Sequence, residues 1–575
     1  MKRNLDEITN KEFDVVIVGG GMFGVCAAWE AAQRGLSAAL IERGDFCQAT
    51  SANHFKMVHG GIRYLQHGDI YRIRESSRER SSFLRIAPHL VQPLPIVIPA
   101  YGHGMKGKEI LGAGMFLYDV FTADRNRGIS DPARKIPRGR FISKKEVMEL
   151  FPGVKSEGLT GAAVFCDAQM YNPPRLALSF LLSAVDSGAA AANYLEVFDF
   201  IRQGDKICGV KARDVFSGDE VEVRGKFVLN TAGPWAANLL ENSMGIEIKP
   251  KPAFSRDAAF VVKRKPTSNN ALTATLKTKD VDAILDRGGR HVFIVPWIDR
   301  EYTLIGVWHI VWGKDKDNIY VTEKELQGFI DEVTEAYPGL ELSLNDVSMV
   351  NTGLTLFGES KPGSTRMSFG KRSRLVDHEK THSIQGIFTL IGVRATVARG
   401  MAEKVIGQIA SRIGKTVAKS TTEKTPLYGG NIENFGEMLQ AAEGNKPAPL
   451  TDKSIVALAH NHGSEYHRVL EYLEKNPEWG TTVGKSHVLK AEIIHAIRRE
   501  MAVTLSDIVF RRTDLGTAGD PGMEAIKESA ELMANELNWT ANHMEHEIDQ
   551  VKEKFRKHGS VKIYNPEYQA KEVVH

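Results

Sequence analysis

The stretch Asp14-Val-Val-Ile-Val-Gly19-Gly20-Gly21-Met-Phe-Gly24 decides the fold of this 575-residue chain. It predicts a β-branched strand, a glycine turn and the start of a helix. Gly19 permits the tight turn, Gly21 lets the backbone approach a pyrophosphate, and Gly24 lets helix and strand pack closely. Glu42 follows 18 residues after Gly24, where an acid accepts a hydrogen bond from a ribose 2′-hydroxyl. The spacing favours a dinucleotide site over a glycine-rich turn that binds nothing.

The residues after Glu42 favour a flavin over a nicotinamide. Thr50-Ser51 supplies hydroxyl groups, and Lys56-Met-Val-His59-Gly60-Gly61-Ile-Arg63-Tyr64-Leu65 adds a second glycine pair. FAD lies buried and extended in flavin enzymes, so a loop beyond the ribose acid reaches the phosphates and the isoalloxazine ring. A nicotinamide enzyme normally proceeds to its next βα unit instead.

Together with Asn230-Thr231-Ala232-Gly233-Pro234-Trp235, these residues resemble the FAD-dependent glycerol-3-phosphate dehydrogenase family over nearly the whole chain. In that family the segments read Thr-Ser-Ser, Lys-Leu-Ile-His-Gly-Gly-Leu-Arg-Tyr-Leu and Asn-Ala-Thr/Ala-Gly-Pro-Trp. The resemblance implies an α/β fold with a doubly wound FAD-binding domain, an interleaved antiparallel-sheet substrate domain and a C-terminal α-helical domain.

The length alone predicts more than one domain. Prolines between 88 and 99 suit an exit from the nucleotide domain, and a turn-rich linker follows residue 425. We expect an FAD-dependent oxidoreductase region at 1–425 and a helical domain at 426–575. Within the first region we expect FAD binding at about 1–95, 160–240 and 360–425 and the substrate domain at about 96–159 and 241–359.

Later segments should return to the cofactor. We expect separate strands at 207–212, 220–223 and 226–233, which would bring Val197 and Gly233 close to the adenosine half. An antiparallel sheet that includes 291–297 and 302–309 should roof the flavin. At 386–403 a strand ends in Gly392 and feeds a helix whose N-terminal amides suit the flavin pyrimidine edge.

The expected FAD contacts combine the fingerprint with the family resemblance. They are Gly19, Gly20, Gly21, Gly24, Glu42, Arg43, Thr50, Ser51, Lys56, His59, Gly60, Gly61, Val197, Ala232, Gly233, Gly392, Arg394, Ala395 and Thr396.

Oxidation of an alcohol by FAD needs a base for the hydroxyl proton and cations for an anionic handle. His59 is the leading candidate for the base and His309 the rival, although either is also suited to a structural hydrogen bond. Tyr64 either orients the substrate hydroxyl or packs. Arg63 is the first candidate for a phosphate or carboxylate contact, with an internal ion pair as the alternative.

Three sequence departures from the family lie around the expected substrate. Arg372 aligns with a phosphate-binding arginine of the family, and an alignment shifted by two residues places Arg374 at that position instead. Thr355 stands where the family has a substrate-binding arginine, and Arg394 stands where it has a lysine. In place of Gly-Thr-Thr-Asp the chain reads Gly306-Val-Trp-His309, so we expect Trp308 to narrow the pocket.

Three interpretations remain open. The first is oxidation of sn-glycerol 3-phosphate in a rearranged pocket, with electrons passed to quinone or another acceptor. The second is a dehydrogenase or oxidase of the same fold that acts on another polyol, sugar derivative or hydroxy acid. The third is a flavoprotein without catalytic activity.

Composition excludes several partners. A net charge of +3 with 25% charged residues gives no nucleic-acid signature. Cys26, Cys47, Cys166 and Cys208 form no CxxC pair, so we expect no metal site. The polar, acidic opening does not suit a signal peptide, and we expect a cytoplasmic protein. A homo-oligomer is one expectation for the assembly of this chain.

No apolar run reaches the ~18 to 20 residues of a membrane-spanning helix. The segment 105–121 is short, apolar and basic at one end, so it is either a buried helix or an interfacial one. Because the family includes monotopic enzymes, peripheral contact with the inner face of the membrane is one expectation. Residues 492–513 show helical periodicity and resemble the family's C-terminal cap, where we expect Arg511 and Arg512 to form an ion-pair network.

Overall fold

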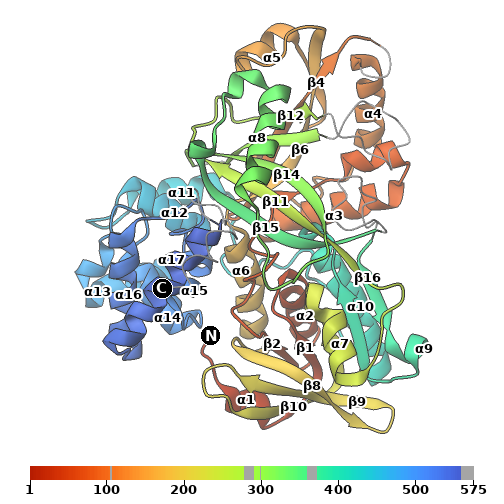
Figure 1. The fold of residues 1–575 in the computed structure, drawn as a ribbon, viewed down its shortest axis with the longest axis vertical. Coiled ribbons are helices and arrows are strands. Elements are labelled where there is room, and N and C mark those ends of the chain that lie inside the picture. The colour runs from red at the N-terminus through yellow and green to blue at the C-terminus, as the bar shows by residue number, and fades with distance from the viewer. Residues whose placement is uncertain (104–106, 277–290, 298–299, 359–371, 559–575) are drawn as a thin grey trace.

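A computed structural model describes residues 1–575 with the exception of 104–106, 277–290, 298–299, 359–371 and 559–575. Two large sheets lie one above the other in Figure 1, and the C-terminal helices pack beside them. Each sheet draws strands from distant parts of the sequence, so the two halves of the molecule are interleaved.

The lower sheet has the strand order β16-β17-β10-β1-β2-β7, and β9 and β8 extend it from β10. The five strands from β17 to β7 are parallel, whereas β16 and the β8–β9 hairpin are antiparallel. Its strands are β1 (Glu12–Val18), β2 (Ala38–Ile41), β7 (Ala190–Ala192), β8 (Leu195–Gln203), β9 (Lys206–Asp214), β10 (Glu220–Asn230), β16 (Arg374–Asp377) and β17 (Ile387–Ile391).

Both faces of this sheet are covered, as a parallel sheet requires. Side chains alternate along β1, so Val15 and Ile17 pack in one core and Val16 and Val18 in another. The first core contains α2 (Met22–Gln33), α6 (Pro173–Asp186) and α10 (Ala398–Ile413). The second contains α7 (Ala236–Met244). The predicted doubly wound fold is confirmed.

The upper sheet has the order β15-β11-β14-β13-β12-β4-β6-β3, with β5 beside β6. Its pairs are antiparallel except for β4 and β12, which run parallel. Its strands are β3 (Met57–Val58), β4 (Val91–Tyr101), β5 (Arg140–Ser143), β6 (Leu159–Met170), β11 (Ala253–Val262), β12 (Ala271–Thr275), β13 (His291–Trp297), β14 (Tyr302–Trp312) and β15 (Val347–Phe357).

Two strands differ from the expected arrangement. Residues 159–170, of which 160–170 were expected in the FAD-binding part, form β6 of the upper sheet, where they pair with β4. The strands expected at 220–223 and 226–233 are one strand, β10. Its first half pairs with β9 and its second half with β1, so a single strand joins the antiparallel extension to the parallel sheet.

The C-terminal helices share a core with the upper sheet. Ile493, Leu505 and Val551 pack in the same cluster as Phe55 and Trp297. The helices are α11 (Phe435–Gly444), α12 (Asp452–His462), α13 (His467–Lys475), α14 (Lys490–Arg499), α15 (Leu505–Asp507), α16 (Met523–Leu537) and α17 (Ala541–His558).

The single helix expected across 492–513 is wrong. Helix α14 ends at Arg499, Met501 takes a left-handed backbone conformation, and the chain resumes with α15 and a π-helical turn at Ile508–Arg512.

Helix α4 (Lys108–Phe121) has two different sides. Leu111, Met115 and Tyr118 are buried, whereas Phe116, Leu117 and Val120 are exposed. None of the helices in the described ranges combines the length and apolar character needed to cross a bilayer. The remaining α-helices are α1 (Leu5–Thr9), α3 (Ile70–Ile86), α5 (Lys144–Leu150), α8 (Glu323–Ala336) and α9 (His378–His382).

Candidate active site

A cavity of about 790 Å³ lies between the carboxyl ends of the parallel strands and the upper sheet. Its volume is in the upper part of the range of about 300–1,000 Å³ that small-molecule sites occupy. Open α/β sheets bind ligands at this edge. The lower sheet contributes Gly19 and Gly21 after β1, Glu42 after β2, Ala232 after β10 and Gly392 after β17.

The glycine turn at one end of the cavity could not carry side chains. Gly19 has φ 103°, which favours glycine, and a Cβ on Gly24 would lie 1.9 Å from the carbonyl oxygen of Gly19. Gly21 caps the N-terminus of α2, and the Met22 N–H donates to Ser51 Oγ at 2.9 Å. Backbone N–H groups and the helix dipole therefore face the cavity where a pyrophosphate would bind.

Glu42 is held in place beside this turn. Its two carboxylate oxygens accept from the Gly20 N–H at 2.7 Å and from the Gly44 N–H at 2.9 Å. Burial raises the pKa of Glu42, although both hydrogen bonds act in the opposite direction. The carboxylate is thus oriented by the backbone, and its remaining lone pairs suit a ribose hydroxyl.

Arg43 and Trp235 form the next part of the wall. The Arg43 guanidinium lies over the indole ring at 4.4 Å and binds Asp317 at 2.5 Å. The buried indole Nε1 of Trp235 has no hydrogen-bond partner in the described protein, which suits it to donate to a bound molecule. Glycine turn, acid and orphaned donor together fit the adenosine and pyrophosphate half of FAD.

Most of the expected FAD contacts line this cavity, namely Gly19, Gly21, Glu42, Arg43, Thr50, Ser51, His59, Gly61, Val197, Ala232, Gly233, Gly392, Arg394, Ala395 and Thr396. Gly20, Gly24 and Gly60 do not line it, because each packs against protein: Gly20 on Phe46, Gly24 on Gly19, and Gly60 on Arg80.

Lys56 does not reach the cavity either. Its backbone is left-handed, with φ 58°, and its ammonium lies 4.8 Å from the centre of the Trp297 ring. The side chain faces a second, smaller cavity, so the expectation that it binds the cofactor is corrected.

His59 lines the main cavity and is positioned by a buried aspartate. Its Nδ1 lies 3.3 Å from Asp167 Oδ2, while Asp167 Oδ1 accepts from the Gly60 N–H at 2.7 Å and from Arg80 Nη1 at 2.9 Å. Burial works against the charged carboxylate, but the His59 hydrogen bond and the Arg80 charge lower the pKa of Asp167 overall. If Asp167 accepts from Nδ1–H, the neutral His59 ring presents an unprotonated Nε2.

His309 forms a second histidine–aspartate pair in the same cavity. Its Nδ1 lies 2.7 Å from Asp257 Oδ1, and that oxygen also accepts from Ser255 Oγ at 2.5 Å. Asp257 and His309 are opposite each other on β11 and β14, so the register of the upper sheet sets this pair.

Cations surround Tyr64 at the same end. Arg72 lies over the Tyr64 ring at 4.2 Å and Arg394 at 5.0 Å. Arg394 also donates to Ser76 Oγ at 2.8 Å, whereas Arg63 is exposed and lines the cavity. Tyr64 therefore packs against two guanidinium groups. Arg72 is paired with Asp69 at 2.7 Å and Arg394 lies 3.4 Å from Glu75, and together with Arg63 they form the positive end of the cavity, which suits an anion.

Two expected pocket residues lie elsewhere. Arg372 is exposed, stacks on Tyr71 at 4.9 Å and does not line the cavity. Trp308 stacks on Phe329 at 4.9 Å on the opposite face of the upper sheet, so it does not narrow the pocket. The reason is strand alternation, which turns its neighbours on either side toward the cavity. Thr355, which replaces the family's arginine, does line it.

Sequence reasoning missed Asp167 and Asp257. Asp167 lies 108 residues from His59 along the chain, and Asp257 lies 52 residues from His309. The available signal was the only acid of each strand: Asp167 is the one charged residue of β6, and Asp257 follows Ser255 and Arg256 in β11. An unpaired carboxylate is seldom buried, so an acid inside a core strand such as β6 indicates a partner.

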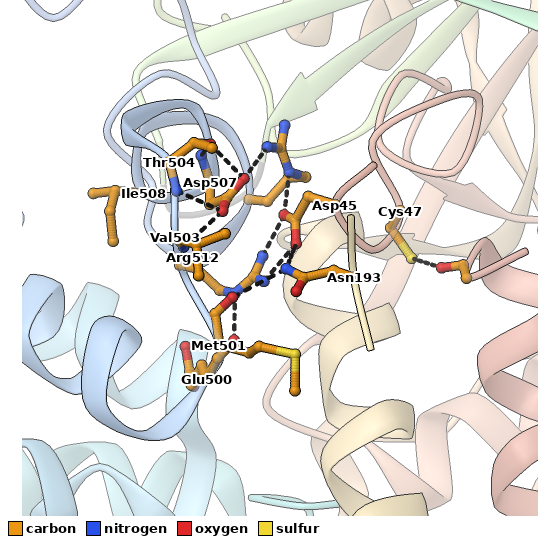
Figure 2. Close-up of polar contacts among 12 residues, drawn as sticks. Asp45, Cys47, Asn193, Glu500, Met501, Val503, Thr504, Asp507, Ile508 and Arg512 are labelled. Atoms are coloured by element: carbon orange, nitrogen blue, oxygen red, sulfur yellow. Dashed lines mark hydrogen bonds and ion pairs between the residues drawn. The ribbon is translucent and has the colours of Figure 1, made fainter. Parts of the chain in front are cut away.

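Figure 2 shows how the C-terminal helices attach to the loop that follows Glu42. Asp45 is buried and binds Arg511 Nε at 2.5 Å and Arg512 Nη1 at 2.7 Å, while Arg511 also binds Asp507 at 2.7 Å. Asn193 donates to Asp45 Oδ1 at 3.0 Å. The ion-pair network expected for the two arginines is confirmed.

Comparisons with known proteins agree with this arrangement. Residues 14–372 match the FAD dependent oxidoreductase family, and residues 420–544 match the C-terminal domain of alpha-glycerophosphate oxidase. Over 562 residues the chain is 29% identical to "Glycerol-3-phosphate dehydrogenase" of Synechocystis sp., with 96% of this chain and 98% of that protein covered. Over 548 residues it is 29% identical to "Glycerol-3-phosphate dehydrogenase 2" of Mycobacterium bovis, covering 94% and 87%.

A solved structure has the same fold. The glycerol-3-phosphate dehydrogenase from Bacillus halodurans complexed with FAD superposes with a TM-score of 0.75 at 22% identity, and 97% of each chain is covered. The predicted combination of an FAD-binding α/β region and helical C-terminal region is thus found in a known protein.

Proposed function

The chain belongs to the FAD-dependent oxidoreductase family, and on that premise we propose that it oxidises sn-glycerol 3-phosphate to dihydroxyacetone phosphate. One observation carries the proposal: two histidine–aspartate pairs and a positive end share one cavity with a dinucleotide-binding turn. The printed names of the relatives support the same substrate.

The mechanism divides the work between cofactor and protein. FAD, when bound, supplies the acceptor for the hydride of the alcohol carbon. A neutral histidine accepts the hydroxyl proton, and its aspartate partner sets the tautomer and stabilises the resulting imidazolium. Arg63 and Arg394 bind the phosphate, because guanidinium groups match its geometry and charge.

His309 is the stronger candidate for the base. Its bond to Asp257 is 2.7 Å, against 3.3 Å between His59 and Asp167. Arg80 offsets the charge of Asp167, whereas Asp257 accepts from the neutral hydroxyl of Ser255, so more carboxylate charge acts on His309. We assign proton acceptance to His309 and substrate positioning to His59, which reverses the order expected from sequence.

A second candidate substrate rests on one observation. Thr355 lines the cavity where the family has an arginine, and Arg372 lies outside the cavity. The anionic group of a bound substrate would therefore contact fewer cations than the family pattern implies. This arrangement favours a different polyol, sugar derivative or hydroxy acid with a weaker anionic group.

The acceptor we propose is membrane quinone, reached from the lipid surface. The exposed patch Phe116, Leu117 and Val120 on α4 supports peripheral contact, with Phe141 packed on the same helix at Gly112. Another soluble acceptor is the alternative.

The test is anaerobic reduction of the bound flavin by a panel of alcohols. We expect sn-glycerol 3-phosphate to bleach the flavin absorbance faster than its enantiomer sn-glycerol 1-phosphate, and faster than glycerol, glycerate or sorbitol 6-phosphate. Faster bleaching by another member of the panel supports the second candidate. No bleaching by any hydroxy compound would contradict both.

A further inference from the structure

The second cavity, which Lys56 faces, has a volume of about 160 Å³. It lies between the loop at 48–56, the start of α6, strand β15 and the C-terminal segments around Arg511 and Lys554. This volume is large enough for a phosphate with a few additional atoms and too small for a nucleotide.

Lys56 is a buried lysine without an anionic partner among the described residues. Its residue is 3% exposed, and among the described residues its ammonium makes no hydrogen bond or ion pair, only the contact with the Trp297 ring. A buried ammonium costs free energy unless a counter-charge is present. This side chain therefore lacks the partner that its burial calls for.

Two further cations face the same space. Lys554 on α17 is half-buried, and its ammonium lies 5.7 Å from the centre of the Phe510 ring. It forms no ion pair with the described residues. Arg511 uses Nε and Nη2 for Asp45 and Asp507, which leaves Nη1 outside these bonds. Asn351, only 5% exposed, adds an amide. The described lining contains no aspartate or glutamate.

Local charge favours an anionic ligand. Arg511 and Arg512 are balanced by Asp45 and Asp507, so the excess positive charge of the lining comes from the two lysines when they are protonated. We propose that this second cavity binds a small oxyanion of the phosphate class, either inorganic phosphate or a short phosphomonoester, between the flavin loop and the C-terminal helices.

The proposed site would influence the flavin cavity directly. Gln48, Asn53 and Asn351 line both cavities, so one layer of side chains separates them. An anion there would also join Lys56 of the flavin loop to Lys554 of the C-terminal helices. Occupancy is expected to slow the release of FAD, because the loop and the helices are then held together.

Protonation of both lysines is linked to binding. Burial first and Arg300 second lower the pKa of Lys56 to about 7, and burial with Arg511 lowers the pKa of Lys554 to about 8. An anion favours the charged ammonium, so binding at pH 8 takes up protons. The charged or titratable groups around the two lysines are Arg300, Asp514, His54, Arg511, Asp507, Asp45 and Glu547.

The test is calorimetric titration of the FAD-loaded Arg63→Ala variant with inorganic phosphate at pH 7. This background removes one of the two proposed phosphate contacts in the main cavity, and binding is read without turnover. The lysine variants then distinguish phosphate in the second cavity from any that Arg394 still binds. We expect Lys56→Gln and Lys554→Gln each to weaken phosphate binding at least tenfold. The control Lys552→Gln lies on the same helix in an exposed pair with Asp549 and should change nothing.

Additional measurements keep the outcome decisive. Titration with glycerol 2-phosphate distinguishes a phosphomonoester from free phosphate as the preferred ligand. At pH 8 the measured heat of phosphate binding should depend on the ionisation enthalpy of the buffer, because binding takes up protons. Phosphate should also slow the release of FAD at least threefold. If Lys56→Gln loses its flavin, Lys554→Gln, whose side chain is half-buried, carries the test. Undiminished phosphate affinity in the lysine variants, or no binding in the Arg63→Ala background, would overturn the proposal.

Discussion

Arg512 binds both carboxylate oxygens of Asp45, Nη1 to Oδ2 and Nη2 to Oδ1, each at 2.7 Å, although the residues are 467 positions apart. Both side chains are buried, and Figure 2 shows them pointing toward each other. Asp45 lies three residues after Glu42, so this ion pair fixes the C-terminal helices to the loop that carries the expected ribose contact. The two arginines, opposed by burial, hold the pKa of Asp45 well below its usual range.

Arg512→Ala should destabilise the protein by about 3–5 kcal/mol, because it leaves part of a buried carboxylate without its partner. Thermal unfolding followed by circular dichroism measures the loss. Arg213→Ala, which removes an exposed pair with Glu220, is the matched control and should cost at most about 1 kcal/mol. An equal loss in both variants would contradict a special role for the Asp45 pair. The pKa of Asp45 is lower in the folded protein than in the unfolded chain. The ionised carboxylate therefore stabilises the fold fully above the unfolded-state pKa, and this stabilisation is lost as the pH falls toward the folded-state pKa.

Gly24→Ala should abolish or strongly weaken FAD binding, because the added Cβ would collide with the carbonyl oxygen of Gly19 at 1.9 Å. Flavin absorbance per mole of purified protein gives the readout. In Gly328→Ala the new Cβ meets nothing within 4 Å, and the flavin content should match the wild type. Full flavin occupancy in Gly24→Ala would argue against the turn as the binding element.

His309→Gln should lower the rate of anaerobic flavin reduction by about 10²–10⁴-fold, as expected for the loss of a general base. His59→Gln should cause a smaller loss, since its aspartate is offset by Arg80. Stopped-flow absorbance measures both rates, and the exposed His467→Gln is the control. A larger loss in His59→Gln than in His309→Gln would return the assignment to the order expected from sequence.

Glu492→Gln should stabilise the protein in alkaline solution. Burial raises the pKa of Glu492 to about 8, although its oxygen accepts from the Leu489 N–H at 2.9 Å. A raised pKa means that the native state binds the extra proton, so stability falls as the pH rises from the unfolded-state value toward 8. The glutamine keeps an acceptor without the charge. We expect a gain of roughly 2–4 kcal/mol at pH 8.5 and little change at pH 4.5, measured by denaturant unfolding. A gain independent of pH would contradict the titration.

The double variant Phe116→Ser/Val120→Ser should reduce flotation with liposomes, because it removes apolar area from the exposed side of α4. Phe216→Ser removes a comparably exposed ring from a turn after β9 and should float like the wild type. Should the wild type fail to float, α4 would have no role at a lipid surface.

The local sequence determined the nucleotide end of the site. The strand, glycine turn and helix of residues 14–33 interact over short distances, so propensity and spacing were enough to predict them. The same holds for Glu42, since the strand that precedes it is the next in the sheet. The ion pairs of Arg511 and Arg512 were also predictable, because buried arginines need carboxylates.

The substrate end depended on tertiary structure. The partner of His309 is set by the register of β11 against β14, and that of His59 by the position of β6, neither of which local sequence encodes. Trp308 lies on the far face of its strand and Lys56 turns away from the flavin loop, so neighbours in sequence became separated in space. Spacing along the chain fixes which backbone approaches a ligand, but long-range pairing decides which side chains meet there.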